Sequence, residues 1–87
     1  MNKATFHIEI FQEGNVYVGL CPELYVSSFG ETIEEARVSL HEAVEAFMEE
    51  CTAMETLEEV MEEAGFIREN DIWMPREAVI RETLSVG

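Results

Sequence analysis

The chain has 87 residues, of which 47% are hydrophobic, and this length fits one small domain that spans residues 1–87. Its formal net charge at pH 7 is −14, from 19 acidic and 5 basic residues. Because nucleic-acid binding depends on Lys and Arg at phosphates, we expect no direct contact with DNA, RNA or an acidic membrane.

The same charge favours a basic protein partner, since complementary charge speeds encounter and suppresses wrong partners. The alternative is that the charge only keeps the protein soluble. No run of eighteen apolar residues and no signal peptide are found, so we expect a cytoplasmic protein with no membrane span. Cys21 and Cys51 lack metal-ligand spacing and are expected to be buried thiols.

Three strands are expected before the first helix. Residues 5–11 alternate between polar and apolar side chains, with one apolar face made of Phe6, Ile8 and Ile10. A turn at residues 12–15 leads to a second strand at residues 16–21, so the two strands form an antiparallel hairpin. Pro22 ends the second strand because it has no N–H to donate, and a third strand is expected from Tyr25 to Phe29.

A long helix is expected from Thr32 to Cys51. Thr32 and Glu35 form a Thr-x-x-Glu capping box, in which the Thr hydroxyl accepts an early backbone N–H and the Glu reaches back to the cap N–H. Apolar residues then recur every three or four positions and form one stripe: Ile33, Ala36, Leu40, Ala43, Val44, Phe47 and Cys51. This stripe requires an apolar sheet to cover it.

The remaining third of the chain predicts a second, shorter helix and a closing strand. The helix begins with a second capping box at Thr56 and ends at Gly65. An extended run at residues 66–68 and a turn at Asn70–Asp71 follow, with Trp73 in a loop. Residues 78–86 fit a strand or a helix, and their Thr, Val and Ile content favours a strand that joins the sheet.

Catalytic and metal-binding motifs are not found. The serines have no nucleophile context, His7 and His41 are expected on exposed faces of different elements, and His41 has the spacing of a surface pair with Glu45. The single Asp and the Glu doublets do not make a metal site. We therefore expect neither an enzyme nor a cofactor.

Three aromatic residues fit the expected core poorly. Phe11 and Phe29 do not match the buried faces of their strands, and Trp73 lies among polar residues. Each is either an anchor for a partner or second copy, since aromatic residues are enriched in interface hot spots, or a residue tucked under the helices.

The motifs of the first half resemble the HicB-like antitoxin family. A Phe-x-Ile-x-Ile strand leads to Cys21-Pro22-Glu23-Leu24 and then to Gly30-x-Thr32-x-Glu34-Glu35-Ala36, and the resemblance covers Phe6 to about Glu50. It implies a three-stranded antiparallel sheet backed by a long helix, with a fourth strand after it. It also implies that the protein binds and blocks a small, basic ribonuclease toxin.

The chain departs from the family pattern at two places. Many such antitoxins carry a C-terminal DNA-binding module, whereas this sequence shows none. A glycine that often follows the Cys-Pro-Glu-Leu segment is replaced by Tyr25 and Val26.

The sequence therefore predicts an α+β fold: a three-stranded antiparallel sheet in β-β-β-α-β order, backed by one long helix, with a short second helix and a C-terminal strand joining the sheet. The expected function is a non-catalytic antitoxin that blocks a small basic ribonuclease and forms a homodimer or higher homo-oligomer. The alternative is a stand-alone oligomeric module for a small ligand or metal. The expected partner-binding residues are Glu13, Glu34, Glu42, Glu45, Glu49, Phe29 and Trp73.

Overall fold

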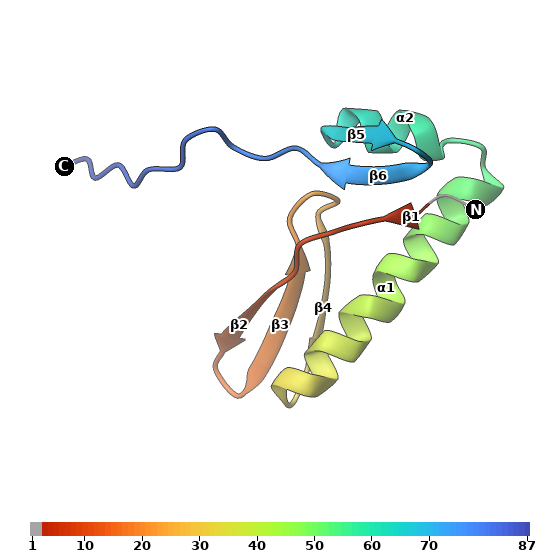
Figure 1. The fold of residues 1–87 in the computed structure, drawn as a ribbon. Helices are drawn as coiled ribbons and strands as arrows, with labels where there is room; N and C mark the ends of the chain where they lie inside the picture. Colours follow the sequence, from red (N-terminus) through yellow and green to blue (C-terminus); the bar gives the residue numbers. More distant parts are fainter. Residues whose placement is uncertain (1–2) are drawn as a thin grey trace.

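The computed structural model describes residues 3–87 and has an α+β fold, in which a long helix packs on a sheet (Figure 1). Two three-stranded sheets and two helices make up the fold. In chain order the elements are β1 (Lys3–Ala4), β2 (Glu9–Glu13), β3 (Val16–Cys21), β4 (Val26–Gly30), α1 (Ile33–Ala53), α2 (Leu57–Glu63), β5 (Phe66–Glu69) and β6 (Ile72–Pro75). The predicted fold class is therefore confirmed.

The first sheet is an antiparallel meander in the order β2-β3-β4. A two-residue turn joins β2 to β3, and Gly14 adopts a positive φ of 60° there. The predicted second strand has the same bounds as β3, and β4 is shifted by one residue from its prediction.

The first predicted strand is wrong in its position, because residues 5–8 belong to no strand and β2 begins at Glu9. Here the chain crosses from one sheet to the other. The Thr5 N–H donates to the Trp73 carbonyl at 3.0 Å, and the His7 N–H donates to Glu23 Oε1 at 3.1 Å. These bonds to two different partners replace a continuous ladder with β3.

Thr32 is the N-cap of α1, as predicted, but only one of the two hydrogen bonds of the predicted capping box is formed. The Glu35 N–H donates to the Thr32 hydroxyl at 3.0 Å, while that hydroxyl donates to Glu35 Oε2 at 3.3 Å. The Glu35 carboxylate thus accepts a hydrogen bond from the Thr32 hydroxyl. In a capping box it would accept one from the Thr32 backbone N–H instead. Ala36, Leu40, Val44 and Cys51 of the predicted stripe are buried, but Ile33 is 48% exposed.

The second sheet has the order β1-β6-β5, and it contains the largest corrections. Trp73 lies in β6 and not in a loop, and β6 pairs with both β5 and the N-terminal β1. Asn70 and Asp71 have positive φ values of 49° and 64°, as the two central residues of a type I′ hairpin turn do. Helix α2 packs against β5.

The predicted second capping box is not formed. Thr56 makes no side-chain cap hydrogen bond, and its hydroxyl donates instead to the Cys51 carbonyl at 3.4 Å. Gly65 follows α2 with a φ of 87°, as a glycine that ends a helix does.

Two apolar clusters form the core, and they share side chains. One contains Cys21, Leu40 and Val44; the other contains Met61, Phe66 and Trp73. Three half-buried residues pack against both clusters: Phe6, Leu24 and Met48. The rings of Phe6 and Phe66 meet edge to face with centroids 5.3 Å apart, so the two sheets share one continuous apolar interior.

The C-terminal tail, residues 76–87, corrects the prediction for residues 78–86. It forms neither strand nor helix and extends away from both sheets (Figure 1). None of its residues pairs with a strand of either sheet, so strand propensity alone does not produce a strand here. Within residues 3–87, neither helix is long and apolar enough to cross a membrane.

Candidate functional site

One face of the β2-β3-β4 sheet is covered by α1. A Cβ on Gly19 would lie 3.1 Å from the Leu40 side chain and 3.2 Å from the Ala36 carbonyl oxygen, so the helix approaches the sheet closely here. The hydroxyl of Ser28 on β4 is hydrogen-bonded to the hydroxyl of Ser39 on α1. Gly19 and Ser28 are register partners, and both therefore lie on the helix side.

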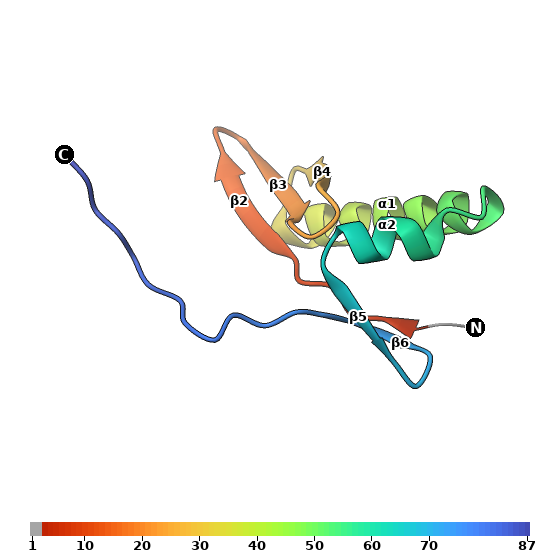
Figure 2. The ribbon, with the colours of Figure 1, turned by 90° about the horizontal axis from the view of Figure 1, so that it is seen from above.

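The opposite face carries a row of apolar side chains. Val18 is paired with Phe11 on one side and Phe29 on the other, and these three residues alternate with those that face α1. Phe11 is 50% exposed and Phe29 is 71% exposed. Helix α1 packs on the face that contains Gly19, and α2 packs against β5 (Figure 2), so neither helix of residues 3–87 covers this opposite face. We call Phe11, Val18 and Phe29 the aromatic row.

Acidic side chains flank the aromatic row. Glu9 and Glu13 lie two positions before and after Phe11 on β2, so they share its face of the sheet. Both are exposed. The surface therefore combines an apolar centre with a negative border, a combination that suits a protein with an apolar patch among basic residues.

Phe29 extends this surface towards α1. A shallow hollow of about 370 Å³ lies between β4 and α1, and it is lined by Phe29, Glu34, Glu35, Val38, Ser39 and Glu42. The structure thus brings together three predicted partner-binding residues, Phe29, Glu34 and Glu42. Glu13 shares the sheet face of Phe29.

The two remaining acidic positions lie further along α1, away from the aromatic row. Glu45 pairs with His41 at 3.1 Å, as the spacing of these residues predicts. Glu49 is exposed one turn later. Neither lines the hollow beside Phe29.

Trp73 is the predicted partner-binding residue that the structure contradicts. Its side chain is 2% exposed in the second core cluster, and the Arg68 guanidinium lies 5.6 Å from the centre of its ring. Its neighbours in β6, Ile72 and Met74, are 38% and 43% exposed, so Trp73 lies on the buried face of the strand and they lie on the exposed face. Trp73 therefore stabilises the fold and is inaccessible to a partner.

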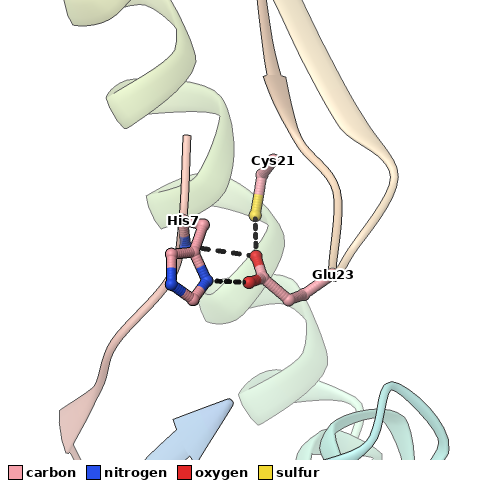
Figure 3. Close-up of polar contacts among 3 residues, drawn as sticks. All are labelled: His7, Cys21 and Glu23. Atoms are coloured by element: carbon pink, nitrogen blue, oxygen red, sulfur yellow. Dashed lines mark hydrogen bonds and ion pairs between the residues drawn. The ribbon is translucent and has the colours of Figure 1, made fainter. Parts of the chain in front are cut away.

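A polar cluster at the turn after β3 holds His7, Cys21 and Glu23 together (Figure 3). The Glu23 carboxylate accepts from the His7 backbone N–H and contacts His7 Nδ1, and the Cys21 thiol donates to it at 3.6 Å. Burial would raise the pKa of Glu23, but the hydrogen bonds from His7 outweigh it and hold this pKa below its usual value.

The geometry of this cluster does not suit nucleophilic catalysis. Cys21 is fully buried, and burial, with the negative Glu23 beside it, raises the pKa of the thiol. Its sulfur faces a carboxylate rather than the imidazole. The Cys-Pro-Glu-Leu segment thus stabilises the fold: Cys21 lies in the core, Glu23 binds His7, and Leu24 contacts both clusters.

A second hollow, of about 520 Å³, lies between α1 and the N-terminal segment. Its apolar lining comes from Ala4, Phe6, Ile8, Val38 and Val44, and its polar lining from Glu34, Arg37 and His41. We call this hollow the N-terminal groove. The sequence did not predict it, because it depends on residues 5–8 leaving the first sheet.

Val18 is the member of the aromatic row that sequence reasoning missed. The alternation of side chains along β3 predicts that the strand has two faces, but it does not indicate which face α1 covers. The available signal was that Phe11 and Phe29 both fell outside the expected core faces. Together they identified the face that remains uncovered.

Neither a metal cluster nor a known relative adds to this description. In residues 3–87, no group of three or more His, Cys, Asp or Glu side chains is placed to hold a metal ion. Comparisons with protein-family models, curated proteins and solved structures produced no match.

Proposed function

We propose that this chain is a non-catalytic antitoxin-like protein that binds and blocks a small basic ribonuclease toxin. The aromatic row on an uncovered sheet face, bordered by Glu9 and Glu13, is the observation that carries the proposal. The resemblance of the first half of the sequence to HicB-like antitoxins supports the choice of a ribonuclease as the partner.

Physical chemistry favours binding by this face. Phe11 and Phe29 are large, exposed and fixed on a sheet, so a partner can bury them at low entropic cost. Acidic residues around them attract a basic protein and accelerate its approach, and salt would weaken that attraction. A ribonuclease binds RNA through basic groups. A protein that covers those groups therefore inhibits the ribonuclease without catalysing any reaction itself.

The test begins with capture at low salt from cells of the native organism, using tagged wild-type protein. A captured small basic protein is purified alone, and its cleavage of RNA is measured with increasing amounts of the untagged chain. We expect inhibition that saturates at a fixed molar ratio. Full ribonuclease activity at micromolar excess of the chain would refute the proposal.

Variants then test the surface. Phe11→Ser and Phe29→Ser are each expected to weaken inhibition at least about tenfold, because each removes a ring from the centre of the interface. Ile67→Ser is the matched control, since Ile67 is a comparably exposed apolar residue (55%) on β5 of the other sheet. Equal effects of all three substitutions would show that the aromatic row is not the binding surface.

A further inference from the structure

We propose that the C-terminal tail of one copy binds as an extended strand in the N-terminal groove of a second copy, so that two copies exchange tails. This mode of self-association does not use the aromatic row, and it holds whether or not the partner is a ribonuclease.

The tail exposes an unusual amount of apolar surface. Val79, Ile80, Leu84 and Val86 are 99%, 71%, 85% and 89% exposed. In an extended conformation Ile80, Glu82, Leu84 and Val86 lie on one side, and Val79, Arg81, Thr83 and Ser85 lie on the other. The first side is apolar except for Glu82, so it is suited to a groove that has an apolar wall and a few polar groups.

The N-terminal groove offers such a wall. Its volume is about 520 Å³, and two of its lining residues, Ile8 and Val38, are 47% and 48% exposed. Because α1 rises ~1.5 Å per residue and a strand ~3.3 Å, the ~15 Å from Glu34 to Val44 accommodates about five residues of strand. Residues 80–84 are long enough to span it.

The polar groups of the groove also suit the tail. Glu82 lies on the same side of the extended tail as Ile80 and Leu84, so it enters the groove with them. Arg37 and His41 line that groove, with Glu34 bound to Arg37 at 2.7 Å. Since a guanidinium carries five N–H donors, Arg37 can bind Glu34 and Glu82 together.

Charge explains why the tail, and not the folded body, makes this contact. The tail carries two Arg and two Glu and is neutral, so the entire net charge of −14 resides on residues 1–75. Two bodies of that charge repel each other at close range. A neutral apolar arm reaches the second copy without bringing acidic surfaces together.

The path of the tail favours exchange over folding back. From β6 it runs away from α1 in both views, whereas the N-terminal groove is bounded by α1 (Figures 1 and 2). Two copies related by a two-fold axis have two tails and two grooves, so exchange closes the assembly as a dimer.

The test compares the mass in solution of four full-length chains by light scattering over a concentration series. We expect wild type to form a dimer of twice the 9.9 kDa chain mass. Leu84→Asp should weaken the dimer at least about tenfold, because it replaces an apolar side chain in the groove with a charged one. Ser85→Asp adds the same charge on the opposite side and should leave the dimer intact, as should Phe29→Ser.

Monomeric wild type at millimolar concentration, or equal loss of dimer in Leu84→Asp and Ser85→Asp, would overturn the proposal. Disulfide trapping tests the location of the tail. A Val38→Cys chain mixed with a Leu84→Cys chain should give a covalent dimer on oxidation, whereas the native cysteines are buried. A double variant that links only within one chain would show that the tail folds back on its own groove.

Discussion

The carboxylate of Glu23 accepts a hydrogen bond of 3.1 Å from the backbone N–H of His7, and its second oxygen contacts the imidazole Nδ1 of the same residue. The Glu23 side chain thus binds both the backbone N–H and the imidazole of His7. His7 lies in residues 5–8, which do not pair with the first sheet. Because residues 4–8 supply one wall of the N-terminal groove, Glu23 also sets the shape of that groove.

The first prediction concerns this carboxylate and pH. The pKa of Glu23 is lowered below its ordinary value of 4.5, so the unfolded state binds the proton more readily. The stabilisation is complete above pH 4.5 and is lost as pH falls through the folded-state pKa. Glu23→Gln should lower the free energy of unfolding at pH 7 by about 1 kcal/mol, a small value because His7 faces water.

Urea denaturation of both proteins from pH 7 to pH 3 checks this expectation. The difference between wild type and Glu23→Gln should shrink as pH falls below 4.5. A difference that stays constant over this range would mean that ionised Glu23 does not stabilise the turn. Glu63→Gln, at an exposed position on α2, is the control for loss of one charge.

The second prediction concerns Tyr25. Its φ is 55°, a left-handed conformation that is unfavourable for a residue with a Cβ, and its side chain is 89% exposed. Tyr25→Gly should therefore raise the free energy of unfolding by about 1 kcal/mol, since little contact is lost and the strain is removed. Tyr25→Ala keeps the Cβ and should give no gain. Thermal denaturation of the three proteins measures both effects.

The third prediction concerns the start of α1. A Cβ on Gly30 would lie 2.5 Å from the Ala36 backbone nitrogen and 2.6 Å from Glu35 Cβ, so an added methyl displaces the helix. Gly30→Ala should cost about 1–3 kcal/mol of stability. Ser27→Ala, at an exposed position of the same strand, should change stability by less than about 0.5 kcal/mol. Equal stability of the two variants would show that this contact relaxes freely.

The fourth prediction concerns the buried indole of Trp73. Among the described residues, its Nε1 has no hydrogen-bond partner. Trp73→Phe removes this unsatisfied donor along with part of the apolar contact, so we expect a change in stability within about 1 kcal/mol. Trp73→Ala leaves a cavity in the second cluster and should cost about 3–5 kcal/mol. Chemical denaturation followed by circular dichroism measures both variants, and a large loss in Trp73→Phe would show that the indole packing dominates.

Local signals in the sequence predicted the elements that depend on neighbours along the chain. The bounds of β3, the Thr32 cap, the burial of Leu40 and the turn at Gly65 follow from alternation, capping chemistry and glycine geometry. The pairing of β1 with β6 joins positions about seventy residues apart. Periodicity within a short window does not indicate such a contact, and the polar residues around Trp73 therefore predict a loop.

The C-terminal tail and the aromatic row also depend on contacts between distant parts of the chain, which the sequence pattern does not indicate. Val79 and Ile80 have strand propensity, but a strand needs an edge to pair with, and propensity does not specify one. Phe11 and Phe29 could be singled out because they broke the expected alternation. Their arrangement around Val18 required the register of three strands.

The pairing of Lys3–Ala4 with Ile72–Trp73 also has a consequence for synthesis on the ribosome. Ala4 and Phe6 emerge long before the cluster of Met61, Phe66 and Trp73, against which they pack. Until then the nascent chain holds Phe6 without its edge-to-face partner Phe66. Contacts of such long sequence separation form late and slowly, so this domain completes its interior only after Trp73 has left the ribosome.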